Sequence, residues 1–553
     1  MQTSDAFPLT TAPAHKDRLS CLGEIALYAA VFLLTTLLFL IVKPLYSVER
    51  DGVVAQAITA CVIGGVAFVG IFLALEKKLT ARRFAVLVLV AGLALRIGYM
   101  LYTPASARQH DTFTKNFDGH EAYAWTIFST GKLPSSNAYQ FYHPPLNALL
   151  QAGFMHFMEG LSNSLSRLLP FGEYFPEKFL AGCPEYIEAE RYFLYSSCQI
   201  LSVLYSFVAC VTMLKILRLF DIRGKGAMLI SAFVTLYPRN IQFSGMLNND
   251  GVSYMFAILA LYFALKWWKR DKGFGNILAC GLCVGLGMMS KLSSATVCLP
   301  IAGIFVWEFV GSVKKNGEAL SLQKLFAEYG VFLLVCAPLG LWFQVYAKLR
   351  FDQPFGFVFS NLNSKLYTGD HSFFSRFFIA FDWKEYFGSL WCRPFEGNYN
   401  LFNYALRSSI FGEFSYWQGE GFAVAATVLA FLSAFLLFAA LIRALYLIFR
   451  YDRKDELRRR EWKKSARDVF FTFLLVQSQA LSEIYFYISM PYGCTMDFRY
   501  IMPMILGMGL TLWLVERRLT REGDALSVTL GRLTAVSTGA FLVFSSLFYM
   551  TCI

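Results

Sequence analysis

The chain has 553 residues, of which 56% are hydrophobic and 16% are charged, with a formal net charge of +12. A soluble globular domain carries about 25% charged residues, so this composition excludes an ordinary soluble protein. Several uncharged windows of about twenty residues are long enough to cross a bilayer as helices, and they lack the alternation of a barrel strand. The sequence therefore predicts an all-α polytopic membrane protein.

The apolar windows predict about thirteen transmembrane helices. In chain order they are Glu24–Val42, Val53–Leu75, Phe84–Tyr102, Phe193–Ile216, Gly226–Tyr237, Val252–Trp267, Ile277–Ser290, Ala295–Val310, Phe326–Tyr346, Gly421–Ile448, Val469–Ile488, Ile501–Leu514 and Leu533–Cys552. We divide the chain into an N-terminal tail (1–23), two extra helices (24–83), a core with the first long loop (84–346), a second long loop (347–420) and C-terminal helices (421–553).

Basic residues set the expected orientation, because short loops rich in Lys and Arg stay in the cytoplasm. With a cytoplasmic N-terminus, every basic loop falls on that side, including the strongest run, from Arg450 to Arg467. The net positive charge is thus a topology signal and does not indicate nucleic-acid binding. The opposite face receives residues 103–192 and 347–420, which we expect to form two large external loops with short amphipathic helices, one of them at Ala148–Leu169.

The first external loop contains the sequence F-D-G-H-E-A-Y, residues 117–123. Asp118 and Glu121 are candidate catalytic residues, because a carboxylate at a lipid boundary can act as a general base. The alternative is that Asp118 caps the N-terminus of the helix that follows, with Glu121 three residues on. His120 and Tyr123 in the same motif are candidate substrate-binding residues.

A second motif in this loop reads Q-F-Y-H-P-P-L, residues 140–146. The paired prolines hold Tyr142 and His143 in an extended turn, where His143 can contact a phosphate or orient a carboxylate. The alternative is that the prolines only begin the next helix. A divalent metal is an open question: Asp118, Glu121 and His143 are candidate ligands, but their spacing is not diagnostic.

Two cationic positions stand at predicted outer ends of spans. Lys291 interrupts a long apolar run, and Arg499 with Tyr500 begins the sequence R-Y-I-M-P. A charge at this depth needs an anionic partner or water, so we expect Lys291, Arg499 and Tyr500 to bind a donor phosphate, with snorkelling to the headgroups as the alternative.

Two further charged residues belong to the predicted substrate site. Arg96 lies inside the third predicted helix and requires a partner, which we expect to be a carboxylate of an external loop. Asp250 follows two asparagines in a short external loop; it is either a substrate-binding residue or a cap for the helix beginning near Val252.

Several catalytic motifs are missing from the sequence. It has no P-loop glycines, no H-E-x-x-H and no G-x-S-x-G. This argues against ATP-driven pumping, helical zinc proteolysis and serine hydrolysis.

The order of these motifs resembles the GT-C superfamily of membrane glycosyltransferases, nearest to its protein O-mannosyltransferase-like and lipid A aminoarabinose transferase-like branch. The resemblance runs roughly from Phe84 to Leu514. It rests on six marks in chain order: Arg96 near a span end, D-G-H-E-A-Y, G-x-L-P at 131–134, H-P-P-L, Lys291 after G-L-C-V-G-L-G-M-M-S, and R-Y-I-M-P.

This resemblance implies a polyprenyl-phosphate-linked sugar as donor and an inverting transfer of a hexose or pentose to a hydroxyl of a lipid, glycan or protein. It also implies that a carboxylate of the first external loop is the base, in a bacterial plasma membrane protein whose site faces outside. The usual D-E pair is here His120-Glu121, so the choice between Asp118 and Glu121 stays open. The alternatives are a transporter or lipid flippase, and a lipid-linked glycan ligase.

Overall fold

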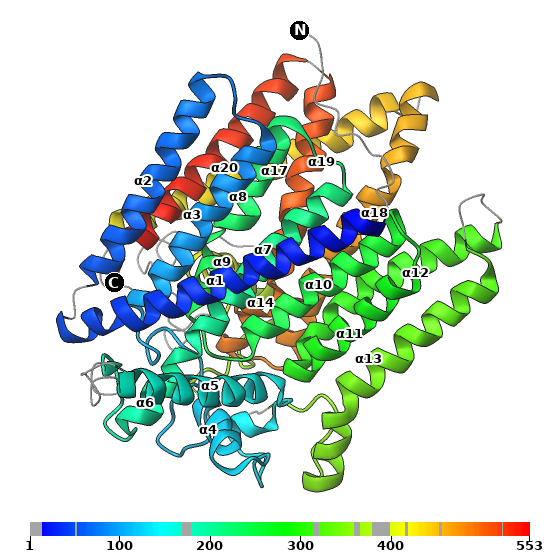
Figure 1. The fold of residues 1–553 in the computed structure, drawn as a ribbon. Helices are drawn as coiled ribbons and strands as arrows, with labels where there is room; N and C mark the ends of the chain where they lie inside the picture. Colours follow the sequence, from blue (N-terminus) through cyan, green and yellow to red (C-terminus); the bar gives the residue numbers. More distant parts are fainter. Residues whose placement is uncertain are drawn as a thin grey trace.

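A computed structural model describes residues 14–49, 52–168, 179–314, 320–358, 365–378, 399–414, 419–452, 456–522 and 524–552. This part of the chain is a bundle of helices (Figure 1), and its one isolated β-bridge joins Tyr367 to Tyr492. The predicted second loop, 347–420, lies partly outside the described residues.

The predicted spans all coincide with helices. Among the described residues, ten helices are long and apolar enough to cross a membrane, or eleven if one bent pair counts as a single span. They are α1 (Ala14–Glu49), α2 (Val53–Leu75), α3 (Ala81–Tyr102), α6 (Ala189–Ser197) continuing into α7 (Gln199–Leu219), α10 (Asp250–Lys269), η4 (Leu292–Val297) continuing into α12 (Cys298–Val313), α13 (Leu322–Phe351), α17 (Glu420–Leu447), α18 (Glu456–Ser489) and α20 (Ala525–Thr551).

The remaining predicted spans are less regular. The bent pair joins η6 (Gly493–Met496) and η7 (Phe498–Ile501) to α19 (Met504–Glu522) across a 59° break. The helices α8 (Gly224–Leu236) and α11 (Phe274–Ser290) have 13 and 17 residues, fewer than the roughly twenty that cross a bilayer alone. The all-helical polytopic fold is confirmed, and the count of about thirteen spans stays a prediction.

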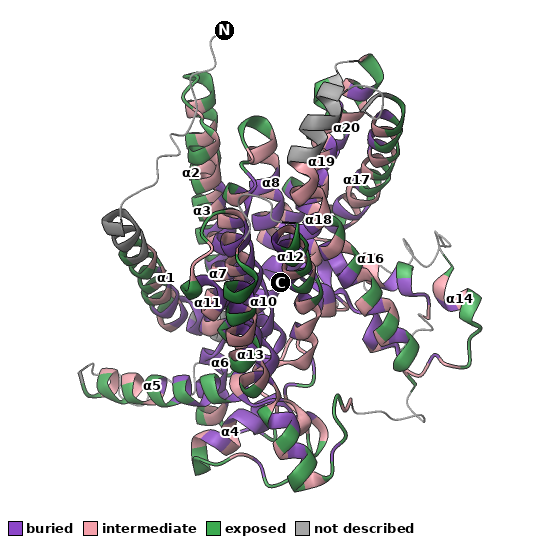
Figure 2. Cartoon of the chain, turned by 90° about the vertical axis from the view of Figure 1, so that its right-hand side faces the viewer, coloured by how far each residue is buried: buried purple, intermediate pink, exposed green. Residues whose placement is uncertain are grey.

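Burial separates a central core from a lipid-facing surface. Helix α10 is the most enclosed span, with 72% of its apolar window buried, whereas only 6% of the α2 window is buried. Figure 2 shows this contrast as purple central helices and green outer faces. Large apolar side chains such as Phe68 and Leu75 are exposed on α2, as expected for a surface that faces hydrocarbon chains.

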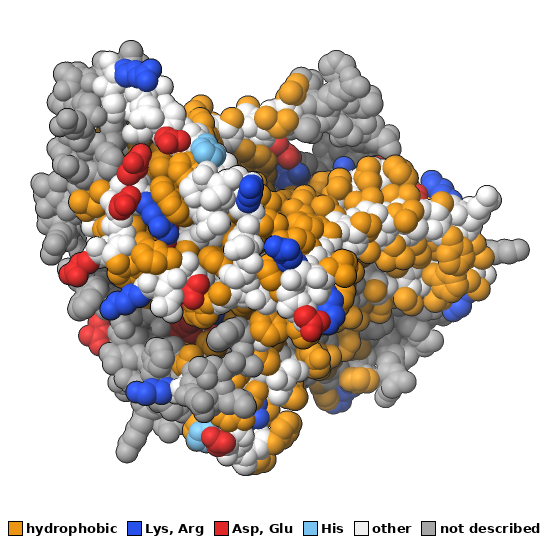
Figure 3. Space-filling model, turned by 90° about the horizontal axis from the view of Figure 1, so that it is seen from below, with side chains coloured by type: hydrophobic (Ala, Val, Ile, Leu, Met, Phe, Trp, Pro, Cys, Tyr) orange, Lys and Arg blue, Asp and Glu red, His pale blue; other side chains and the backbone are white. Residues whose placement is uncertain are grey.

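One end of the bundle carries the loop elements, and we call it the loop end. Here α4 (His120–Thr130), η1 (Tyr139–Tyr142) and α5 (Leu146–Leu168) lie across the helix ends in Figure 1. The amphipathic helix predicted at Ala148–Leu169 corresponds to α5, which buries Met155 and Met158 and exposes Phe157. Seen from this side, the protein shows scattered charges of both signs beside a broad apolar surface (Figure 3).

Three chain interruptions meet at the loop end. Helix α11 stops at Ser290 because Lys291 adopts extended backbone angles (φ −155°, ψ 127°), and the chain continues as η4. A hydrogen bond from the Asn249 side-chain amide to the Ser290 carbonyl oxygen (3.2 Å) connects the start of α10 to this break. Arg499 lies on the third interruption, η7, where the Asp497 side chain accepts from its backbone N–H (3.1 Å). Broken helices leave polar groups that line a cavity rather than lipid.

Candidate active site

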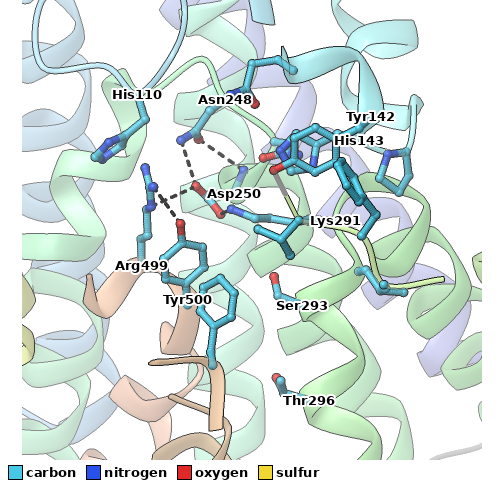
Figure 4. A pocket seen from close by; sticks show the side chains of 18 of the residues that line it. His110, Tyr142, His143, Asn248, Asp250, Lys291, Ser293, Thr296, Arg499 and Tyr500 are labelled. Carbon is cyan, nitrogen blue, oxygen red and sulfur yellow. Dashed lines mark hydrogen bonds and ion pairs between the residues drawn. The ribbon is translucent and has the colours of Figure 1, made fainter. Parts of the chain in front are cut away.

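A cavity of about 330 Å³ opens where these interruptions meet. It is lined by residues of the first long loop, the start of α10, η4, the end of α18 and η7. Its polar and aromatic wall residues include His110, Asp111, His120, Tyr142, His143, Asn248, Asp250, Lys291, Ser293, Thr296, Ser482, Glu483, Tyr485, Arg499 and Tyr500. Figure 4 shows several of these side chains pointing toward one another from different helices.

The centre of the wall is a carboxylate placed between two cations. The Lys291 ammonium donates a hydrogen bond to Asp250, and Arg499 Nε lies 3.9 Å from the other oxygen of the same carboxylate. The Asn248 amide donates to that second oxygen at 2.8 Å. Asp250 and Arg499 are buried and Lys291 is half-buried. These three groups carry one net positive charge, because one carboxylate is shared by two cations.

Tyr500 connects the two cations. Arg499 donates to the Tyr500 hydroxyl at 2.8 Å, and the Lys291 ammonium lies 4.6 Å from the centre of the Tyr500 ring. Arg499 Nε has no hydrogen-bond partner among the described residues. A buried guanidinium with an unused donor can fork onto a phosphate that enters the cavity.

Neutral imidazoles form the side of the cavity nearest the first long loop. The rings of His120 and His143 stack with their centres 5.8 Å apart. Burial lowers the pKa of His120 to about 4, and burial also holds the pKa values of His110 and His143 well below the ordinary value. Tyr123 does not line the cavity; its hydroxyl donates to the His143 carbonyl oxygen at 3.2 Å and so holds the Y-H-P-P turn in place.

Asp111 lies exposed at the rim of the cavity. The Tyr139 hydroxyl donates to its carboxylate at 2.5 Å, and its carbonyl oxygen accepts from the first N–H of α4, that of His120, at 3.0 Å. Partial desolvation of the carboxyl by the surrounding cavity wall acts to raise the pKa of Asp111, but the Tyr139 hydrogen bond and the charge of Arg499 outweigh it, so the pKa lies below its ordinary value. The sequence analysis missed this residue, although it is the first acid of the loop, in Q-H-D at 109–111.

The two carboxylates predicted to be catalytic lie elsewhere. Asp118 accepts a hydrogen bond from the Thr114 hydroxyl (2.7 Å) within its own turn. Glu121 is buried in an ion pair with Arg191, which donates from both Nε and Nη2. Neither residue lines the cavity. Helix α4 turns Glu121 toward α6, and the Asp118 side chain bonds within its own turn; a catalytic role for either residue stays a prediction.

The predicted N-cap is also corrected. The N-cap residue of α4 is Gly119, without a side-chain cap hydrogen bond. Asp118 therefore does not cap this helix, and Glu121 is the acidic residue of its first turn.

Arg96 joins three helices inside the bundle and does not reach the cavity. It donates to the Ser206 hydroxyl (2.8 Å), the Gly92 carbonyl oxygen (2.8 Å), the Cys210 thiol and the Thr235 carbonyl oxygen (3.0 Å). These acceptors are neutral, so the expected carboxylate partner is wrong. Arg96 stabilises the packing of α3 on α7 and α8 and is not placed to bind substrate.

The predicted metal ligands are not brought together. Among the described residues, the one group of His, Cys, Asp and Glu side chains with ligand atoms within 4.8 Å of one another is His110, Glu413 and Asp497. Arg239 donates two hydrogen bonds to Asp497 (2.7 and 2.8 Å), and His110 Nδ1 lies 2.9 Å from Glu413. Arg239 thus offsets the charge of Asp497, and Glu413 also bonds to the Tyr404 hydroxyl.

Comparison with known proteins adds one match. Residues 194–342 match the family model described as dolichyl-phosphate-mannose-protein mannosyltransferase. This segment contains Asp250 and Lys291 but not the first-loop residues or Arg499. No curated protein sequence matches the chain. The family match supports a multi-pass membrane glycosyltransferase of the GT-C superfamily, in agreement with the resemblance found in the sequence.

Proposed function

We propose that this protein transfers a sugar from a polyprenyl-phosphate-sugar donor to an acceptor hydroxyl on the external face of the membrane. The observation that carries the proposal is the site of Lys291, Asp250 and Arg499, in which two cations share one carboxylate in a cavity at the ends of spans. A polyprenyl phosphodiester carries one negative charge, which the two cations can contact. Its isoprenoid chain can remain in the bilayer while its phosphate reaches the cations.

The same cations support bond cleavage. When the acceptor oxygen attacks the anomeric carbon, the bond from that carbon to the phosphate oxygen breaks, and a second negative charge develops on the leaving polyprenyl phosphate. Lys291 and Arg499 stabilise this charge where water is largely excluded, and electrostatic stabilisation of this kind is commonly the largest catalytic contribution. Attack from the face opposite the phosphate inverts the anomeric carbon.

Asp111 is our candidate for the base, in place of Asp118 and Glu121. It stands at the cavity rim, where an acceptor arriving from outside meets the bound donor. Its lowered pKa keeps the carboxylate ionised and ready to accept the proton of the acceptor hydroxyl. A bound phosphate offsets the charge of Arg499, so donor binding raises the proton affinity of Asp111.

The identities of the donor sugar and the acceptor are inferred from the family match and the resemblance, and not from the geometry of the site. The name of the matching family makes a mannosyl polyprenyl phosphate the first donor to test. The acceptor class is a hydroxyl of a protein, a glycan or a lipid.

The test uses purified protein in nanodiscs with polyprenyl phosphate carrying radiolabelled mannose. Lys291→Met and Arg499→Gln remove one charge each, and donor affinity or turnover should fall by roughly 30- to 1,000-fold. Lys348→Met is a matched control, because this lysine is exposed near the end of α13 and lies outside the cavity. Wild-type affinity in both cavity variants would contradict the proposal, and movement of the lipid across the membrane without sugar transfer would favour a flippase.

A further inference from the structure

Glu483 is a buried carboxylate without a hydrogen-bond donor. It lies on α18, is 3% exposed, and lines the same cavity as Lys291 and Arg499. Neither of its carboxylate oxygens has a hydrogen-bond partner among the described residues. A carboxylate in this state is costly to bury, and an ionisable side chain inside a span points to a functional site by default.

A second unused acceptor lies near Glu483 on the same helix. Gln479 lies one turn earlier on α18, is fully buried, and its Oε1 likewise has no described partner. Its amide Nε2 donates to the Thr296 hydroxyl at 3.3 Å, and Thr296 lines the cavity. Figure 4 shows Ser293 and Thr296 following Lys291 along this wall. The carboxyl oxygens of Glu483 and Oε1 of Gln479 therefore remain unused as acceptors, beside hydroxyls of Ser293 and Thr296 that can donate or accept.

The two unpaired oxygens of Glu483 indicate the kind of ligand. Neither a phosphodiester nor an isoprenoid chain has an O–H or N–H to give, and a phosphate is repelled by a carboxylate. The sugar is the part of a polyprenyl-phosphate-sugar that carries O–H groups. The two oxygens of one carboxylate can accept together from neighbouring hydroxyls of a sugar ring.

We propose that Glu483 binds hydroxyl groups of the donor sugar and thereby distinguishes the glycosylated carrier from the bare carrier lipid. The inference rests on the proposed function, because it assumes that Lys291 and Arg499 hold the phosphate of the same ligand. After transfer, the bare carrier gives Glu483 no hydrogen-bond donor and carries additional negative charge near it. Glu483 thus favours release of the bare carrier lipid after transfer and disfavours its rebinding.

The experiment measures two affinities in nanodiscs, for polyprenyl phosphate and for polyprenyl-phosphoryl-mannose. The proteins are wild type, Glu483→Gln, which preserves shape, and Glu483→Ala. We expect wild type to prefer the mannosyl lipid and Glu483→Ala to bind it about 10- to 100-fold more weakly, the scale of charge-assisted hydrogen bonds, with affinity for the bare lipid unchanged or higher. Glu483→Gln should lie between them. Glu328→Gln is the matched control, since this buried carboxylate is outside the cavity and accepts from Trp267.

The outcomes separate this inference from the proposed function. Unchanged affinity of Glu483→Ala for the mannosyl lipid overturns the inference but does not contradict the phosphate site. Water in the cavity would then be the hydrogen-bond donor to Glu483. An equal fall for both lipids also overturns it, because the residue then acts on the phosphate site or on the fold. A wild type that does not discriminate between the lipids overturns it as well. Failure of wild type to bind either lipid overturns the proposed function itself.

Discussion

Lys291 and Asp250 form an ion pair in the cavity wall, at the point where α11 ends and α10 begins. Each residue therefore occupies a helix terminus, where backbone polar groups already need partners. Because Asp250 contacts both cations, its negative charge offsets the repulsion between Lys291 and Arg499. This contact prepares a cationic site before an anion arrives.

Asp250→Asn should destabilise the unliganded protein and increase its response to phosphate. Removing one partner of a buried ion pair typically costs about 3–5 kcal/mol, because the other charge stays buried. A bound phosphate would restore balance, so the rise in Tm on adding polyprenyl phosphate should exceed the rise in wild type. Thermal unfolding in detergent measures both, with Asp352→Asn, an exposed acid paired to Lys348, as control. A smaller ligand-induced rise than in wild type would contradict the shared-carboxylate model.

Asp111→Asn should reduce transfer by about 10²-fold or more while donor binding stays at its wild-type level, the usual result of losing a general base. Asp118→Asn is the matched comparison, because its side chain bonds to Thr114 and does not line the cavity. Single-turnover transfer rates with bound donor measure the difference. Full activity in Asp111→Asn together with loss of activity in Asp118→Asn would instead support Asp118 as the base, as predicted from the sequence.

Tyr139→Phe should shift the acidic limb of the pH–rate profile to higher pH. A base works only when deprotonated, so activity falls as the pH drops through its pKa. The Tyr139 hydrogen bond stabilises the charged carboxylate and lowers the pKa of Asp111, and its removal raises that pKa. The measurement is kcat/KM as a function of pH on the acid side, beside wild type, whose limb should lie at lower pH than that of the variant. An unmoved limb would show that another group is the base.

Glu121→Gln should act on stability and not on the chemical step. Glu121 and Arg191 join α4 to α6 through two hydrogen bonds, and Glu121 is 2% exposed. Breaking this pair should cost about 3–5 kcal/mol. The double variant Glu121→Gln/Arg191→Met should recover part of the loss, which a double-mutant cycle of unfolding measurements can show. A fully stable but inactive Glu121→Gln protein would instead make Glu121 a catalytic residue.

Cysteine labelling tests the predicted orientation. Ser135 is exposed in the first long loop, whereas Ser465 lies near the opposite end of α18. In a background without native cysteines, a cysteine at 135 should react with an impermeant thiol reagent from outside, and one at 465 should not. Reaction at 465 from outside would reverse the orientation and move the cavity to the cytoplasmic face. A third predicted label position, Asn363, is outside the described residues.

Local sequence was enough to predict the helices and several cavity residues. A run of apolar residues specifies a helix in lipid regardless of its neighbours, because the backbone must satisfy its own hydrogen bonds there. Polar residues at the ends of such runs are costly, which is why Lys291, Arg499 and Asp250 could be recognised, and all three line the cavity. The same rule also applied to Glu483, a lone acid in a predicted span, but the sequence analysis did not use it.

Other positions depended on packing that no local pattern contains. Arg96 and Lys291 look alike in the sequence, as single cations in apolar helices. One is surrounded by neutral acceptors of α7 and α8, and the other is beside a carboxylate at a helix break. The acidic residues of the first long loop show the same limit of sequence analysis. Which of their side chains reaches the cavity depends on how α4 packs on α6.

The sequence by itself determined the membrane class, the helices and the set of charged residues that need partners. Each of these depends on the free energy of moving individual residues from water into lipid, which is a local property. Only the tertiary structure decided which partners they have. It placed Glu121 with Arg191, left Asp111 at the rim, and brought Lys291 and Arg499 to one carboxylate from distant parts of the chain. Contacts between residues far apart in the sequence depend on the docking of whole helices, and that arrangement is a property of the packed bundle.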